Sequence, residues 1–210
     1  MNTSSRYIAG IEVREAPKGS GGIGMLVGHA AIFESDSLPF DGVGKPWVER
    51  IAPGAFKRTL REHPDVLALW SHDTSIPIGR TPRTLALRED AHGLHAAVTL
   101  IDTTPCRDAL AACRAGHVTG WSFGFVAKSA RWVRGRDQDL RILDDVDLHE
   151  VSPTAFPAYP GTDLAARSSL YIRNGASAAE ELRSINAERE TFFRDETLTN
   201  SARLMAARFM

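Results

Sequence analysis

Residues 120–127 read GWSFGFVA, and the alternation in this stretch decides the fold class. Its odd positions after Gly120 are aromatic and its even positions are small, in the order Trp121, Ser122, Phe123, Gly124, Phe125 and Val126. A period of two predicts a strand that packs an aromatic face on the core and turns Ser122 to the other side. Taken alone, the stretch favours a serine that fills the strand between two glycines over a serine that acts as a nucleophile.

The same letters match the G-x-S-x-G nucleophile elbow of the α/β-hydrolases. An elbow needs a strand, a sharp turn and then a helix, with the acid and the histidine later in the chain. Here a helix is expected before Ser122 and an extended aromatic run follows it, so the order of elements is inverted. We therefore expect neither an elbow nor the fold of an esterase or lipase.

Short strands and tight turns account for most of the remaining body. Apolar alternation predicts strands at 23–33, 66–72, 84–88, 94–101, 131–134, 140–143 and 147–152, with an irregular edge strand before Gly22 and helices at 55–62 and 104–115. About seven strands with two small helices indicate a mainly β protein, either a barrel or a compact sandwich.

The glycines and prolines divide the chain into two parts. All eleven prolines lie at or before Pro160, and the last glycines are Gly161 and Gly175. Residues 176–210 have neither, which favours helix. We expect a turn-rich domain over 1–160 and a helical tail over 161–210. The tail carries five arginines and six acidic residues from Ala176 onward, so it is either a solvated extension or a partner-binding helix.

Composition excludes several classes of function. The 210 residues are 43% hydrophobic and 24% charged, with a net charge of -1, whereas nucleic-acid binding needs a clustered basic surplus. No apolar run approaches the about 20 residues that span a bilayer, and the polar start lacks the pattern of a signal peptide. The two cysteines, Cys106 and Cys113, are too few for a disulfide framework, share a helix face, and suit packing in a reducing cytosol.

Histidines and a glutamate supply the candidate chemistry. His72 ends an apolar strand at a polar loop, where a general base could be both held and accessible. His149 and Glu150 are neighbours on a strand and must face opposite sides, so only one can reach a common site. Either could orient an imidazole. Each of these residues alone is more simply explained as an ordinary strand-end side chain.

A metal site is not expected. His92 and His95 would need further ligands, and a turn followed by a strand separates them. No glycine loop of the phosphate-binding kind is present.

Read together, the segments around His72, Ser122 and Glu150 resemble the caudovirus prohead protease family, the capsid maturation proteases of tailed phages. Each piece is short, but the occurrence of so many of them in one order, from about residue 28 to residue 160, is a specific signal of the family. The pieces are Gly28-His29-Ala30-Ala31-Ile32-Phe33, Glu49-Arg50-Ile51-Ala52-Pro53-Gly54-Ala55-Phe56, Ser71-His72-Asp73, Pro77-Ile78-Gly79-Arg80, Gly93-Leu94, Asp102-Thr103, Gly120 to Phe125, Glu150-Val151-Ser152 and Phe156-Pro157-Ala158.

The resemblance implies a serine peptidase with a fold similar to the herpesvirus assemblins, a closed or partly closed antiparallel β-barrel of about seven strands with helices. It implies Ser122 as nucleophile and His72 as base. His149 would complete the assemblin order, while the phage family looks like it places an acid at Glu150. We favour Glu150, because a carboxylate also stabilises an imidazolium by its charge.

The resemblance also implies where the protein acts and on what. The substrate would be the major capsid protein with its scaffolding region, inside the assembling prohead in the host bacterial cytoplasm, and self-cleavage and self-association are expected alongside. No cofactor, nucleic acid or membrane is implied. The alternative is a catalytically idle scaffold or assembly protein that keeps the barrel and binds through its tail.

Overall fold

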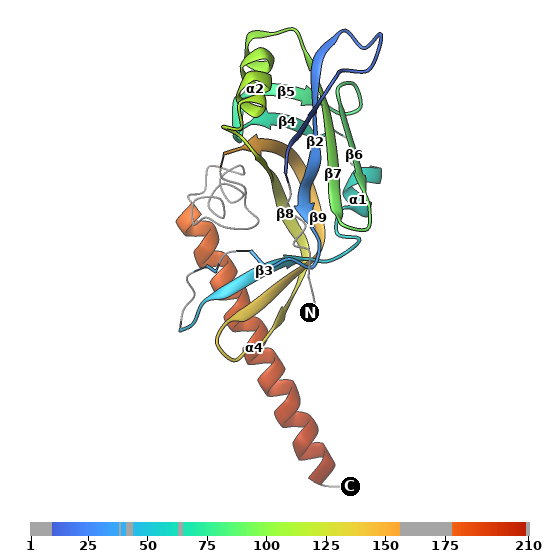
Figure 1. Ribbon diagram of the computed structural model, residues 1–210. Helices are drawn as coiled ribbons and strands as arrows, with labels where there is room; N and C mark the ends of the chain where they lie inside the picture. The colour runs from blue at the N-terminus through green and yellow to red at the C-terminus, as the bar shows by residue number, and fades with distance from the viewer. Residues whose placement is uncertain (1–9, 38, 41–43, 63–64, 156–177, 209–210) are drawn as a thin grey trace, which may run out of the picture.

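The computed structural model describes residues 10–37, 39–40, 44–62, 65–155 and 178–208 (Figure 1). The strands in chain order are β1 (Glu12–Arg14), β2 (Gly22–Ile32), β3 (Trp47–Ile51), β4 (Leu67–Trp70), β5 (Asp73–Arg80), β6 (Leu85–Glu89), β7 (Gly93–Ile101), β8 (Gly120–Val133) and β9 (Asp139–Thr154). The helices are α1 (Lys57–Glu62), α2 (Thr104–Arg114) and α4 (Ala178–Arg208). The described chain is thus mostly β with a few helices, as the sequence predicts.

The first sheet has four strands in the order β1-β2-β7-β6, and every pair in it is antiparallel. Its hairpin between β6 and β7 is the one expected around residues 89–93. The edge strand β1 also confirms the strand predicted before Gly22. Alternation along these strands turns Leu26, Leu94 and Val98 inward, where all three are almost fully buried.

The second sheet has five strands, β3-β9-β4-β5 with β8 on the other edge of β9. Two of the expected strand pairs merge, because β8 and β9 each continue through the segments predicted as separate strands. β9 runs parallel to both β3 and β4, so the prediction of a purely antiparallel sheet is wrong. Long stretches of chain separate these partners, which leaves room for the crossover that a parallel pair requires.

One core lies between the two sheets. Phe56 from the segment before α1 and Phe123 from β8 meet in it with ring centroids 5.6 Å apart. Gly28 lets Trp121 approach β2, since a Cβ at this position would lie 2.5 Å from the indole nitrogen. The pairings in the described residues give two sheets linked by the single bridge between Gly10 and Gly120. They do not close a barrel, so closure stays a prediction.

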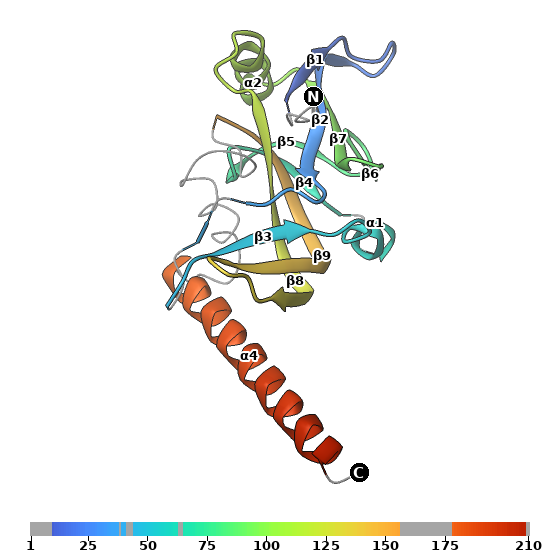
Figure 2. The same ribbon diagram turned by 60° about the horizontal axis from the view of Figure 1, so that its bottom comes forward.

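The long helix α4 confirms the helical tail predicted over 178–208. It begins beside β3 and β8 and runs away from both sheets (Figure 2). Ile185 and Phe193 pack with Trp47 and Trp132 in a second, small apolar cluster. The segment that joins β9 to α4, with the predicted boundary at residues 160–161 and the Phe156-Pro157-Ala158 motif, lies outside the described residues. No helix in the described ranges has both the length and the apolarity to cross a membrane.

Candidate active site

His72 occupies a two-residue turn rather than the end of a strand. Trp70 and Asp73 pair across this turn, and between them Ser71 (φ 51°) and His72 (φ 64°) both take left-handed backbone angles. Such angles match a tight hairpin but are costly for residues with a Cβ. Neighbouring β9 holds the turn, because the Ser71 N–H donates to the Pro153 carbonyl at 3.1 Å and the His72 N–H donates to Ser152 Oγ at 3.1 Å.

Glu150 contacts the imidazole directly. Its Oε1 lies 2.7 Å from His72 Nδ1, and the two side chains are only 2% and 9% exposed. Because an ionised carboxylate only accepts hydrogen bonds, Nδ1 carries the proton in this pair, which leaves Nε2 with a free electron pair. The structure therefore brings together the two residues predicted to be the base and its orienting acid.

His149 is not part of this pair. The register between β8 and β9 shifts here, since Gly124 pairs with Glu150 and Phe125 pairs with Leu148, so His149 is the extra residue of a β-bulge. The imidazole of His72 bonds to Glu150, and the choice of this acid over His149 as the third catalytic member stays a prediction.

The side chain of Ser122 lies on the same face of the sheet as the side chain of Glu150. Ser122 pairs with Ser152 and Gly124 pairs with Glu150 across β8 and β9, so their side chains project to the same side of the sheet. The strand continues straight through Ser122, which confirms that no nucleophile elbow is present. The aromatic face points the other way, with Trp121 and Phe123 in the core.

Two reactive atoms at this site have no hydrogen-bond partner. They are Ser122 Oγ and His72 Nε2, and both are buried. In this structure the two atoms are not bonded to each other, so the candidate nucleophile and base lack the contact that proton transfer requires. Catalytic hydrogen bonds are commonly longer in unliganded enzymes and tighten with substrate. Buried polar atoms without a partner are rare, and a catalytic role is one explanation for them.

Sequence reasoning assigned no role to Ser152, which lies fully buried between the candidates. Its Oγ donates to Glu150 Oε2 at 2.5 Å and accepts the His72 N–H. The signal was available, because Ser152 follows Glu150 by two positions on a strand and so shares its face.

The other chemistry-bearing residues lie elsewhere. Cys106 and Cys113 are free and buried, and burial raises the pKa of Cys113 to about 11, which disfavours a reactive thiolate. His95 faces His29 across β2 and β7 with ring centroids 5.4 Å apart, and His29 Nε2 lies 2.8 Å from an oxygen of Asp90. Among the described residues, no group of three His, Cys, Asp or Glu side chains is arranged to hold a metal ion.

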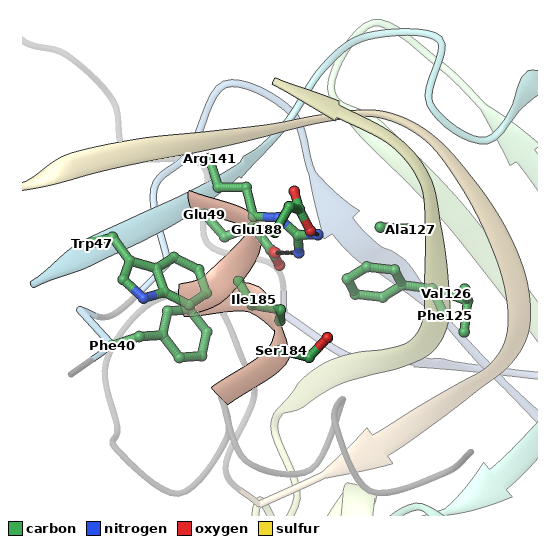
Figure 3. A pocket seen from close by; sticks show the side chains of 10 residues that line it. All are labelled: Phe40, Trp47, Glu49, Phe125, Val126, Ala127, Arg141, Ser184, Ile185 and Glu188. Atoms are coloured by element: carbon green, nitrogen blue, oxygen red, sulfur yellow. Dashed lines mark hydrogen bonds and ion pairs between the residues drawn. The ribbon is translucent and has the colours of Figure 1, made fainter. Parts of the chain in front are cut away.

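A pocket of about 180 Å³ lies further along β8, where α4 meets the sheet (Figure 3). Phe125 and Ala127 form one side, and Ile185 and Glu188 of α4 form another. Arg141 of β9 closes it, donating at 3.1 Å both to Glu49 of β3 and to Glu188. Arg141 therefore ties the tail helix to β9, the strand that carries Glu150.

A family model described as caudovirus prohead serine protease matches residues 10–174. This range contains all four site residues and ends before α4. No curated protein and no solved structure matches the chain.

Proposed function

Because the chain belongs to the caudovirus prohead serine protease family, we propose that it is a serine endopeptidase that cleaves capsid proteins during prohead maturation. The observation that carries this proposal is the buried pair of His72 and Glu150, whose free Nε2 is on the same side of the sheet as the unpartnered hydroxyl of Ser122. No further ionisable group is needed for acyl transfer.

Ser122 is the nucleophile in this mechanism. Its Oγ attacks a peptide carbonyl while His72 Nε2 takes the hydroxyl proton, and the same nitrogen returns that proton to the leaving amine. Glu150 keeps the other nitrogen protonated and stabilises the imidazolium that forms. Backbone N–H groups stabilise the oxyanion. The substrate must draw Ser122 and His72 into hydrogen-bond contact.

We also propose a substrate, a place of action and a domain division, with the family resemblance as their support. The substrate is the major capsid protein with its scaffolding region, cleaved inside the assembling prohead in the bacterial cytoplasm, and the enzyme also cleaves itself. Residues 1–160 form the protease domain on a partly closed barrel, supported by the bridge that links the two sheets, and residues 161–210 form the helical tail.

Coexpression with the cognate major capsid protein tests the function. We expect wild-type protein to shorten the capsid protein and Ser122→Ala to leave it at full length, as read by mass spectrometry of assembled particles. Ser129→Ala is the matched control, because Ser129 lies on the same strand but is exposed. Equal processing by wild type and Ser122→Ala would end the serine protease assignment. Absence of processing by all three proteins, with particles still forming, would support the idle assembly protein.

A further inference from the structure

We propose that Ser152 is a positioning residue of the catalytic apparatus, which fixes the backbone of the base and the carboxylate of the acid to one another. This inference rests on the proposed function, because it assigns roles to the same His72 and Glu150. The hydroxyl of Ser152 contacts Glu150 and the backbone of His72, so it acts through these two residues.

The contacts of Ser152 use both capacities of one hydroxyl. Its hydrogen is donated to Glu150 Oε2 at 2.5 Å, and its oxygen accepts the backbone N–H of His72 at 3.1 Å. Glu150 Oε1 meanwhile holds the imidazole of His72 at 2.7 Å. His72, Glu150 and Ser152 thus form a closed ring of three hydrogen bonds, in which the base is held at its backbone and at its side chain.

The turn that carries His72 needs this support. Ser71 and His72 both have left-handed backbone angles, which cost free energy unless their surroundings impose them. Two hydrogen bonds from β9 hold the turn, and one of them ends on Ser152 Oγ. Removing that oxygen leaves the bond from the Ser71 N–H to the Pro153 carbonyl to hold the backbone of the turn on β9, so the position of the imidazole would be less fixed.

The carboxylate needs the same hydroxyl. Glu150 is 1% exposed, and a buried carboxylate oxygen without a donor is costly. Ser152 satisfies Oε2, so Glu150 cannot rotate away from His72 without losing a bond. Asp73, the carboxylate next to His72 in the chain, accepts hydrogen bonds from the N–H and the hydroxyl of Ser75 instead. It therefore does not take the place of Glu150 beside the imidazole.

Kinetics of Ser152→Ala provide the first test, with Ser152→Thr as the conservative variant. Capsid processing should slow by about 10- to 100-fold in Ser152→Ala and return to within about threefold of wild type in Ser152→Thr. The acidic limb of the pH–rate profile should move to higher pH in Ser152→Ala, because the pair of His72 and Glu150 holds its proton more tightly once the donated hydrogen bond is lost. A uniform fall in rate with an unmoved limb would show a merely structural role and overturn the proposal.

Hydrogen exchange of the His72 amide gives a second test that needs no proteolysis. It is measured in an inactive Ser122→Ala background, with and without Ser152→Ala. We expect exchange at His72 to accelerate at least tenfold when Ser152 is replaced, while amides of β2 keep their rates. Unchanged exchange at His72 would contradict the inference. Processing by Ser122→Ala would instead contradict the proposed function, so the two failures are distinguishable.

Discussion

Glu49 on β3 and Glu150 on β9 are two buried glutamates, and they have partners of different chemistry. Glu49 on β3 pairs with Arg141, at one end of β9, and Arg141 also binds Glu188 of α4. Glu150, near the other end, pairs with the imidazole of His72. An arginine stays protonated and can only hold its partners, whereas an imidazole can give up and regain a proton near neutral pH.

The difference extends to what each pair supports. We call Glu49, Arg141 and Glu188 the helix anchor, because they join α4 to the sheet beside Trp47 and Trp132. Trp47 donates to Asn186 and Trp132 donates to Glu188, both at 3.1 Å. At the site, two buried atoms on different residues, Ser122 Oγ and His72 Nε2, are left without partners, whereas the anchor leaves one such atom, Arg141 Nε. One sheet therefore combines a charge network that fixes a helix with a buried pair of His72 and Glu150, whose Nε2 has no partner.

Replacing the carboxylate of the reactive pair should give the largest effect. We expect Glu150→Gln to lower the rate of capsid processing by about 10³- to 10⁴-fold, because the amide neither stabilises an imidazolium nor enforces the productive tautomer. His149→Ala is the matched control, since its side chain lies at the bulge next to Glu150. The assignment of Glu150 as the acid of the reactive pair is wrong if His149→Ala is inactive while Glu150→Gln processes capsid protein at the wild-type rate.

Breaking the helix anchor should act on stability instead. Arg141→Met leaves Glu49 and Glu188 without their shared cation, at a cost of about 3 kcal/mol in the free energy of unfolding at neutral pH. Arg131→Met is the control: the same change at an exposed partner of Asp144 should cost at most about 0.5 kcal/mol. Urea unfolding of the two variants measures both. Equal stability losses would show that the anchor is no stronger than a surface ion pair.

The apolar part of the same contact can be tested with adjacent phenylalanines. Phe193 is 8% exposed and has Arg134 4.1 Å above its ring, whereas Phe192 is 39% exposed. We expect Phe193→Ala to weaken docking of α4 by about 2 kcal/mol and Phe192→Ala by less than about 0.5 kcal/mol. Hydrogen exchange of α4 amides near residues 185–193 reports both values. Similar exchange in the two variants would mean that α4 does not dock through this face.

The smallest expected effect is a pH dependence of the anchor. Burial raises the pKa of Glu49, because desolvation outweighs the attraction of Arg141. A raised folded-state pKa stabilises the fold fully below the unfolded value of about 4.3 and loses that contribution as pH rises through the folded value. Wild type should therefore lose stability relative to Glu49→Gln as pH rises above about 4.5. Parallel urea midpoints for the two proteins across that range would contradict this assignment.

Alternation along the chain was enough to predict the face of β8 that carries Ser122 and the β6–β7 hairpin, and the absence of glycine and proline after Gly175 was enough to predict the long tail helix. The strand β3 was missed because its sequence WVERI contains two charged residues, and Glu49 is buried only through Arg141 far along the chain. The strand β5 was missed because it is an exposed edge that contains Pro77, which breaks the strand pattern.

The candidate site likewise has a part that could be predicted from the sequence and a part that could not. His72, Ser122 and Glu150 could be chosen from local pattern and family resemblance. The turn at Ser71 and His72 could not, because neither residue is a glycine or asparagine that signals left-handed backbone angles. That turn is imposed by hydrogen bonds from β9, and so depends on tertiary contacts that no local pattern contains.

Covalent labelling of Ser122 tests the central claim most directly. The wild-type protein is treated with a fluorophosphonate, which reacts with activated serines, and the modified residue is located by peptide mass spectrometry. We predict a single adduct on Ser122, absent in Ser122→Ala and formed far more slowly in His72→Ala. An adduct on a different serine, or an unlabelled Ser122 in protein that is processing capsid substrate, would contradict the account.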